Sequence, residues 1–152
     1  MKQAAIIASL ALSALSMSAS AQAGTVGQAF NVTATLTTAC ASNNTGPADV
    51  AFGAYTSFTA TALTANTTVS FKCTRNSATP TAATLTGGTG GTTGSIKGLT
   101  YTLVLGTATL AAGAAGAPDV YSYLISGTMA AGQAGDATAA PGPVVHTLTI
   151  TY

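Results

Sequence analysis

Apolar residues alternate with threonine and serine at a period of two along much of this chain, and this pattern restricts it to β-structure. Segment 98–106 is typical, since Leu99, Tyr101, Leu103 and Leu105 share one face of a strand, and the other face carries Thr100, Thr102 and Val104. No segment shows the longer period of an amphipathic helix. We therefore expect an all-β chain built as an antiparallel sandwich.

The alternating segments are separated by clusters of Gly, Pro, Asn and Ser, which are the residues of turns and loops. Besides 98–106, we expect strands at 26–38, 48–55, 66–74, 81–86, 119–127 and 144–152. The segments rich in glycine and alanine predict loops, at 87–96, 106–118 and 130–143. The alternative for 106–118 is a short helix, against which its glycines argue. No internal repeat and no second folded domain is indicated.

The first 23 residues have the pattern of a secretory leader. A positive start at Lys2 is followed by an apolar run over 4–15 and by the small-x-small site Ala21-Gln22-Ala23. The run is too short for a membrane span. We expect cleavage after Ala23, which leaves one domain of ordinary size, exported through the periplasm.

Charged residues make up only 5% of the chain, against a usual share of about 25%. In the mature chain the cations Lys72, Arg75 and Lys97 are balanced by Asp49, Asp119 and Asp136. No basic patch is present, so nucleic acid is not expected as a partner. A surface of low net charge favours association, which suits a subunit that packs against others.

Two cysteines, Cys40 and Cys73, occur in this exported chain and predict one disulfide. Closing a loop of this length should stabilise the fold by roughly 3–4 kcal/mol. The alternative is a metal or redox pair. Their spacing fits no metal motif, and His146, the only histidine, lies far away in the sequence.

Catalytic chemistry finds little support in the residues. No nucleophile-elbow motif is present, and the three aspartates are isolated in the sequence. We expect no enzyme, no cofactor and no metal. His146 has two interpretations, a pH switch or a residue at the rim of the sandwich.

Segment 26–38 is the longest alternating stretch near the mature N-terminus. Threonines take one face, and the apolar face carries Val26, Phe30, Val32, Ala34 and Leu36. This segment is either the first strand of its own sandwich or a strand that the chain offers to another molecule.

The order of elements resembles the spore coat protein U domain family, which includes subunits of archaic chaperone–usher pili. An alternating strand ends in Cys40 and is followed by Phe52-Gly53-Ala54-Tyr55. Then come Phe71-Lys72-Cys73-Thr74, a Leu99-x-Tyr101 strand, and a Thr/Ile strand that stops at Tyr152. The family's Gly-x-Tyr-x-Asp element is replaced here by Pro-Gly-Pro-Val-Val-His over 141–146.

This resemblance implies an incomplete immunoglobulin-like sandwich that a periplasmic chaperone holds and an outer-membrane usher assembles. The N-terminal strand of an identical or related subunit then completes each sandwich in a homopolymer. The implied division is a signal peptide (1–23), a donor strand (24–38) and a pilin-like sandwich (39–152). We expect the acceptor groove to be lined by inward residues of three strands: Phe71, Leu103, Leu148, Ile150 and Tyr152.

The last predicted strand reaches Tyr152, so we expect its edge to need a cover from elsewhere. The resemblance favours a structural subunit of an adhesive fimbrium at the cell surface, with a role in cell adhesion and biofilm. Three alternatives remain. They are a self-contained secreted sandwich that binds sugars or surfaces, a coat or surface-layer protein, and a hydrolase.

Overall fold

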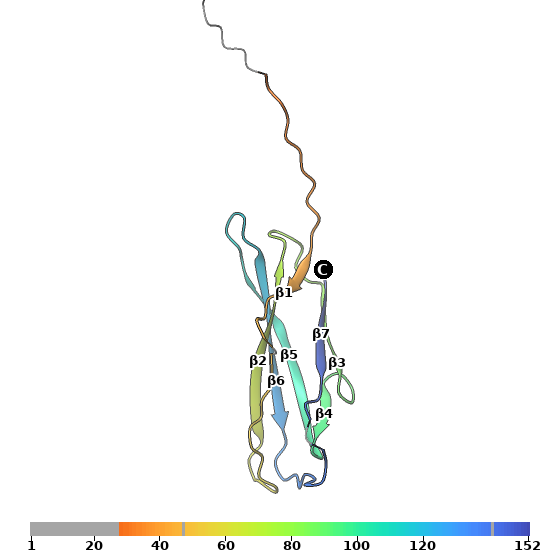
Figure 1. The fold of residues 1–152 in the computed structure, drawn as a ribbon. Helices are drawn as coiled ribbons and strands as arrows, with labels where there is room; N and C mark the ends of the chain where they lie inside the picture. The colour runs from red at the N-terminus through yellow and green to blue at the C-terminus, as the bar shows by residue number, and fades with distance from the viewer. Residues whose placement is uncertain (1–27, 47, 141) are drawn as a thin grey trace, which may run out of the picture. The chain divides into compact units, whose positions relative to one another are not determined.

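The computed structural model describes residues 28–46, 48–140 and 142–152, which consist of strands and loops (Figure 1). It divides into two units, residues 1–35 and 36–152. Within the first unit, residues 28–35 form no strand. The second unit, which we call the body, holds all seven strands of the described chain. In the described ranges no helix is long and apolar enough to cross a membrane.

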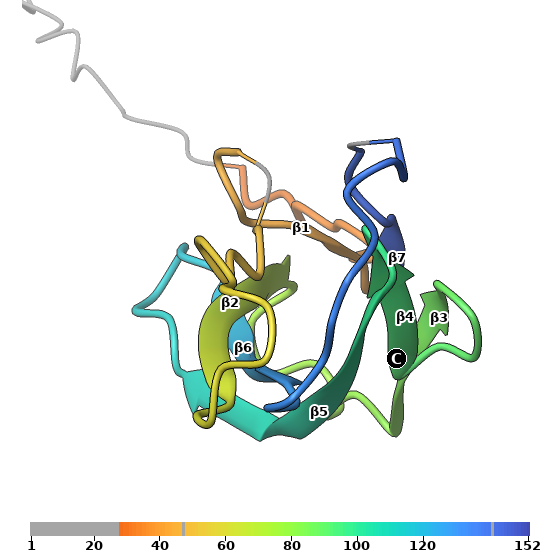
Figure 2. The same ribbon diagram turned by 90° about the horizontal axis from the view of Figure 1, so that it is seen from below.

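The body contains two antiparallel sheets, which confirms the all-β, immunoglobulin-like expectation. The larger sheet has the order β1 (Cys40–Ser42), β2 (Leu63–Cys73), β6 (Asp119–Met129), β5 (Leu99–Ala111) and β4 (Thr93–Ile96). The smaller sheet pairs β3 (Ala82–Gly87) with β7 (His146–Thr151). The larger sheet curls, so that β4 at its end lies beside the smaller sheet (Figures 1 and 2).

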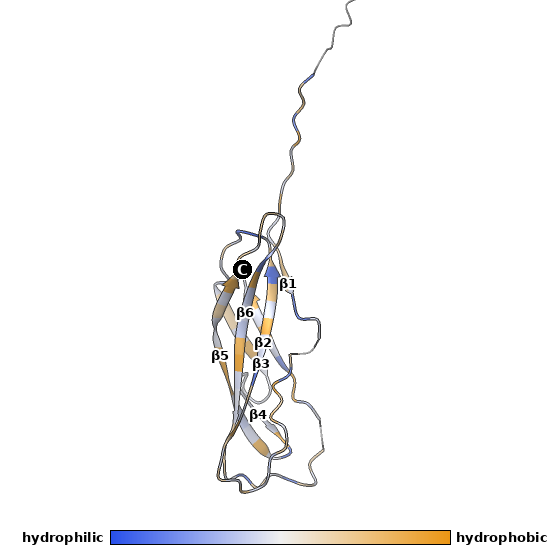
Figure 3. Cartoon of the chain, turned by 90° about the vertical axis from the view of Figure 1, so that its left-hand side faces the viewer, coloured by the Kyte–Doolittle hydropathy of each residue, from blue (hydrophilic) through white to orange (hydrophobic). Residues whose placement is uncertain are grey.

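The period-two alternation determines which side chains are buried in the long strands, and apolar bands alternate with paler ones along them (Figure 3). The inward residues Tyr101, Leu103, Ile125 and Met129 form one buried cluster. Cys73, Tyr121 and Tyr123 form a second. The intervening positions are mostly Thr and Ser, which remain at the surface. The sequence prediction for these faces is therefore confirmed.

The prediction of a loop over 87–96 is wrong at its end, because β4 occupies Thr93–Ile96. This strand pairs with the start of β5 through a two-residue turn, Lys97-Gly98, in which both residues have positive φ, 51° and 66°. Such a turn matches the right-handed twist of a hairpin. The glycines before β4 make the composition of the whole segment typical of a loop, so composition alone does not predict this strand.

The predicted loop 106–118 is also shorter than expected, since β5 continues to Ala111. A β-bulge between Leu105 and Ala108 explains the difference. The bulge inserts one extra residue, which keeps Ala108 on the core face although the sequence alternation changes phase there.

The strand predicted at 48–55 does not form, because these residues pair with no strand in the described structure. Their alternation is nevertheless used for packing. Val50, Phe52 and Tyr55 are partly buried against the core, while their neighbours are exposed. The segment has the side-chain pattern of a strand without the backbone ladder.

Candidate functional site: an open apolar groove

A cavity of about 800 Å³ opens along the body between two segments that are far apart in the sequence. One lip is residues 48–52 and the other is residues 144–148, which include the start of β7. The floor is made by inward side chains of both sheets: Val69, Phe71, Leu85, Ile96, Tyr101, Leu103 and Ile125. The groove is thus an open section of the hydrophobic core.

The 48–52 lip exists because the chain turns away from the edge of β2 soon after β1 ends at Ser42. The Asn44 side chain accepts a hydrogen bond from the Ser70 amide (2.7 Å) and donates one to the Thr68 carbonyl (3.0 Å). These are groups on the edge of β2 that a longer β1 would use. An asparagine side chain that imitates a peptide group commonly ends a ladder in this way.

Close packing then holds this lip over β6. An added Cβ at Gly127 would lie 2.6 Å from Val50 Cγ1 and 2.7 Å from Phe52 Cζ, so only glycine allows both side chains to reach the sheet. The Phe52 ring also packs against Tyr101, with 5.7 Å between centroids. Past the lip, the Tyr55 hydroxyl donates to the Ala130 carbonyl (2.9 Å) and anchors the segment.

The 144–148 lip is the edge of a two-stranded sheet. β7 pairs with β3 from His146 to Thr151, and in the described chain its other edge has no strand partner. Val144, His146 and Leu148 are partly buried, and the residues between them are exposed. Both lips of the groove therefore present backbone groups that no ladder within the described residues uses.

A polar pair lies at one point of the groove wall. The Tyr101 hydroxyl is 2.8 Å from His146 Nε2, and His146 Nδ1 is 2.9 Å from the Gly91 carbonyl oxygen. Because a carbonyl only accepts, Nδ1 carries a proton, and in the neutral imidazole Nε2 accepts from the tyrosine hydroxyl. Burial raises the pKa of the Tyr101 hydroxyl. The pair links the two sheets, and sequence reasoning did not find it.

Glycines make room for this pair. A side chain at Gly88 would overlap the His146 ring, and one at Gly94 would overlap the Tyr101 hydroxyl. Both glycines lie in the segment that composition alone assigned to a loop. His146 therefore occupies a fitted position beside the groove, with both ring nitrogens hydrogen-bonded.

Three of the five residues predicted for an acceptor groove line the cavity: Phe71, Leu103 and Leu148. Ile150 packs instead with the second buried cluster, and Tyr152 is exposed beyond the end of β7. The lip residues Val50 and Phe52 were missed, although the alternation over 48–55 was a usable signal. Whether the lining residues accept a strand stays a prediction.

Of the residues predicted for a donor strand, Phe30, Val32, Ala34 and Leu36 are all exposed. Val26, like the leader over 1–23, lies outside the described residues. Residues 28–39 form no strand within this chain. Segment 28–36 thus carries large exposed apolar side chains at alternate positions.

The predicted disulfide between Cys40 and Cys73 is confirmed. It joins β1 to the end of β2, where the two residues are direct partners in the ladder. Nearby, buried Asp119 accepts hydrogen bonds from the amides of Gly113 and Asn76, both at 2.8 Å. These bonds lower the pKa of Asp119 and hold the loops at this end of the body together.

No group of three metal-ligating side chains lies close together among the described residues. A family model described as Spore Coat Protein U domain matches residues 26–114, which is more than half of the chain. The chain therefore belongs to this family, whose members are structural and pilin-like. Searches of the curated proteins and of the solved structures found no match.

Proposed function

We propose that this member of the Spore Coat Protein U domain family is a structural subunit of a surface pilus, polymerised by donation of a β-strand from one copy to the next. Segment 24–38 is the donor, and the groove between residues 48–52 and 144–148 is the acceptor. The activity is assembly, and no chemical step is involved.

The observation that carries this proposal is the pair of unpartnered lips. An extended segment lying between them would bond to the free edge of β7 and cover the apolar floor at once. On the other lip, residues 48–55 have the side-chain alternation of a strand but form no ladder within the described residues. A single added strand supplies what both lips lack.

The donor segment matches the groove in length and chemistry. From Phe30 to Leu36 an extended chain spans about 20 Å, and β7 spans about 17 Å, at about 3.4 Å per residue. Burying Phe30, Val32 and Leu36 contributes roughly 5–9 kcal/mol at about 1.5–3 kcal/mol each. Ordering the backbone opposes this gain, and the new ladder bonds fix the register.

Secretion completes the proposal. The leader pattern over 1–23 directs export, and a periplasmic chaperone covers the groove until an outer-membrane usher exchanges it for the donor of the next subunit. The fibre of identical or related subunits then stands at the cell surface. An open apolar core section needs such a temporary cover, because exposed groove residues would otherwise aggregate.

The test is a charge placed on one face of the donor. Val32→Asp puts a carboxylate against the apolar floor and should abolish polymers. Thr33→Asp is the matched control, because it carries the same charge on the opposite face of the strand and should still polymerise. The readout is the fibre yield in the sheared surface fraction, measured by electron microscopy and sedimentation.

Both variants should leave the fold of the body intact, because Val32 is 85% exposed and lies outside it. Normal polymerisation of Val32→Asp would disprove the donor assignment. A monomeric wild-type protein whose own segment 26–38 is protected from amide exchange would instead favour the self-contained sandwich.

A further inference from the structure

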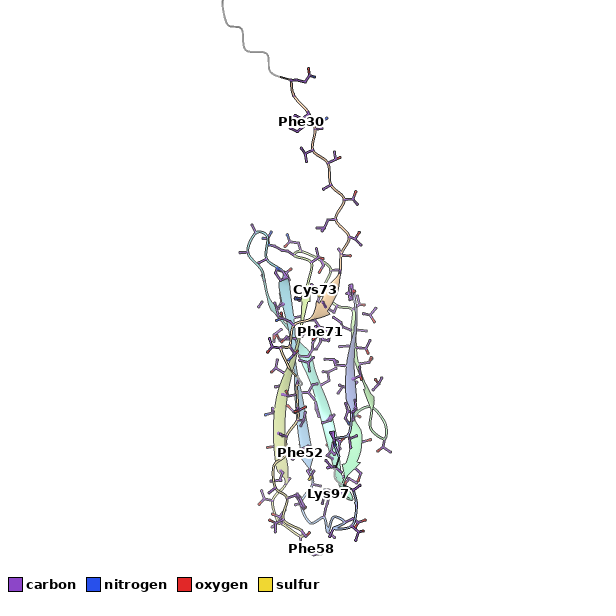
Figure 4. All side chains as sticks on the ribbon, in the orientation of Figure 1. Phe30, Phe52, Phe58, Phe71, Cys73 and Lys97 are labelled. Atoms are coloured by element: carbon purple, nitrogen blue, oxygen red, sulfur yellow. A yellow bond between two sulfur atoms is a disulfide. The ribbon has the colours of Figure 1, made fainter. Side chains whose placement is uncertain are left out.

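Phe58 is an aromatic residue held outward under backbone strain. Its side chain is 74% exposed and its φ is 63°, a region that bulky residues rarely occupy. It lies at the end of the body remote from Cys73, near Lys97 (Figure 4). A strained backbone at an exposed aromatic residue points to a role that the fold of one copy does not use.

The loop around Phe58 is fixed by neighbouring loops. The Phe58 amide donates to the Gln133 carbonyl (2.9 Å), and the Ser57 hydroxyl donates to the Ala134 carbonyl (2.5 Å). Gln133 in turn accepts a bond from the Thr100 amide (2.7 Å) at the start of β5. Phe58 is therefore presented on a rigid support, which lowers the entropy cost of any contact it makes.

The direction of a donated strand determines what this end faces. All strand pairings in the described body are antiparallel. A donor antiparallel to β7 runs toward the His146 end of β7, which is the Phe58 end of the body (Figures 1 and 4). Leu36 of the donor copy then leaves the groove there. Only three residues, 37–39, separate it from β1 of that copy, which begins at Cys40.

Three linking residues reach at most about 14 Å between Leu36 and Cys40. The Cys40 end of the donor copy is thus held next to the Phe58 end of the acceptor copy. The Cys40 end carries an exposed apolar side chain, Leu110. Its loops are stabilised by Asp119 and by Arg75, whose Nε donates to the Gly113 carbonyl (2.8 Å). Each of the two facing ends therefore carries an exposed apolar side chain, Phe58 on one and Leu110 on the other.

We infer that Phe58 anchors a second contact between successive copies, in which it packs against loops 74–81 and 110–118 of the copy that donates the strand. This inference rests on the proposed polymerisation. The contact is head-to-tail, so each copy uses a different surface on either side, and it repeats along an open fibre. Without this contact, only the donor strand and its short linker would join successive bodies. The contact therefore limits bending between them.

The experiment uses fibres of the full chain with the photoreactive residue p-benzoylphenylalanine at position 58. Irradiation should give a ladder of covalent multimers, with crosslinked peptides that map to 74–81 or 110–118. The matched control carries the same residue at Val104, which is exposed on the outer face of β5 and should give no such ladder. A second variant, Phe58→Asn, tolerates the same backbone φ and removes the ring.

Fibres of Phe58→Asn should form in normal yield and break into shorter pieces on shearing than those of Val104→Thr. Fibres that give no ladder from position 58, or crosslinks that map elsewhere or to another protein, would overturn this contact and leave strand donation intact. If the wild-type chain forms no fibre, both proposals fail together. Unchanged fibre length in Phe58→Asn would also count against the contact.

Discussion

Removal of the disulfide by the double substitution Cys40→Ala/Cys73→Ala should cost the body a large part of its stability. The cysteines are 33 residues apart, and the loop-closure relation for a loop of this size gives about 3.7 kcal/mol at 25 °C. Removal of the bond should also destabilise the folded state directly. β1 has only three residues in its ladder with β2, so the covalent bond carries much of its attachment.

With an m-value of about 2 kcal/mol/M, the urea midpoint of unfolding should fall by about 2 M. The chain has no tryptophan and five tyrosines, so tyrosine fluorescence of the purified exported protein is the suitable probe. Wild-type protein with the disulfide reduced should shift by the same amount as the double variant, which separates the crosslink from the volume of the sulfur atoms.

A loss below about 1 kcal/mol would refute the reasoning, since it would mean that the unfolded chain is already restricted without the crosslink. A loss in the double variant that reduced wild type does not share would assign the effect to packing of Cys73, which is buried among tyrosines.

Three further changes test the site. Asp119→Asn should flatten the acid dependence of stability. The lowered pKa of Asp119 stabilises the fold above about pH 4, and this contribution is lost as the pH falls through the pKa of the folded state. Urea titrations from pH 2 to 7 measure the free energy of unfolding. Tyr101→Phe leaves His146 Nε2 without its donor and should lower the free energy of unfolding by about 1–2 kcal/mol in urea. Gly94→Ala should cost about 1–3 kcal/mol by crowding the same hydroxyl, and thermal melting should show a smaller loss when Tyr101→Phe is also present.

The sequence was sufficient for the elements whose side chains alternate between core and solvent. The inward faces of β2, β5 and β6 follow from the period of two, and the disulfide follows from two cysteines in an exported chain. The predicted ends of the strands were less accurate, since β2 begins at Leu63 and not at residue 66, and β6 continues to Met129 and not only to residue 127. Strand ends depend on ladder partners, which a periodic pattern does not identify.

The groove could not be predicted in full from the sequence, because it depends on contacts between residues that are far apart in the chain. Residues 48–55 were predicted as a strand because their side chains alternate, but their backbone leaves β2 once the Asn44 side chain takes the edge positions. β4 was missed because glycines before it obscure a hairpin that the Lys97-Gly98 turn forms. The fitting of His146 beside Tyr101 joins residues 45 apart in the chain.

The Cys40–Cys73 bond also decides how tension would travel through the molecule. A pull on the residues that precede Cys40 passes through the sulfur atoms into the end of β2 instead of peeling the three-residue β1 away. β2 is paired with β6 over eleven consecutive positions, so the load acts lengthwise on many hydrogen bonds together. Strands loaded in shear resist far more force than strands opened one bond at a time, so the disulfide places the load on a pairing that is suited to bear it.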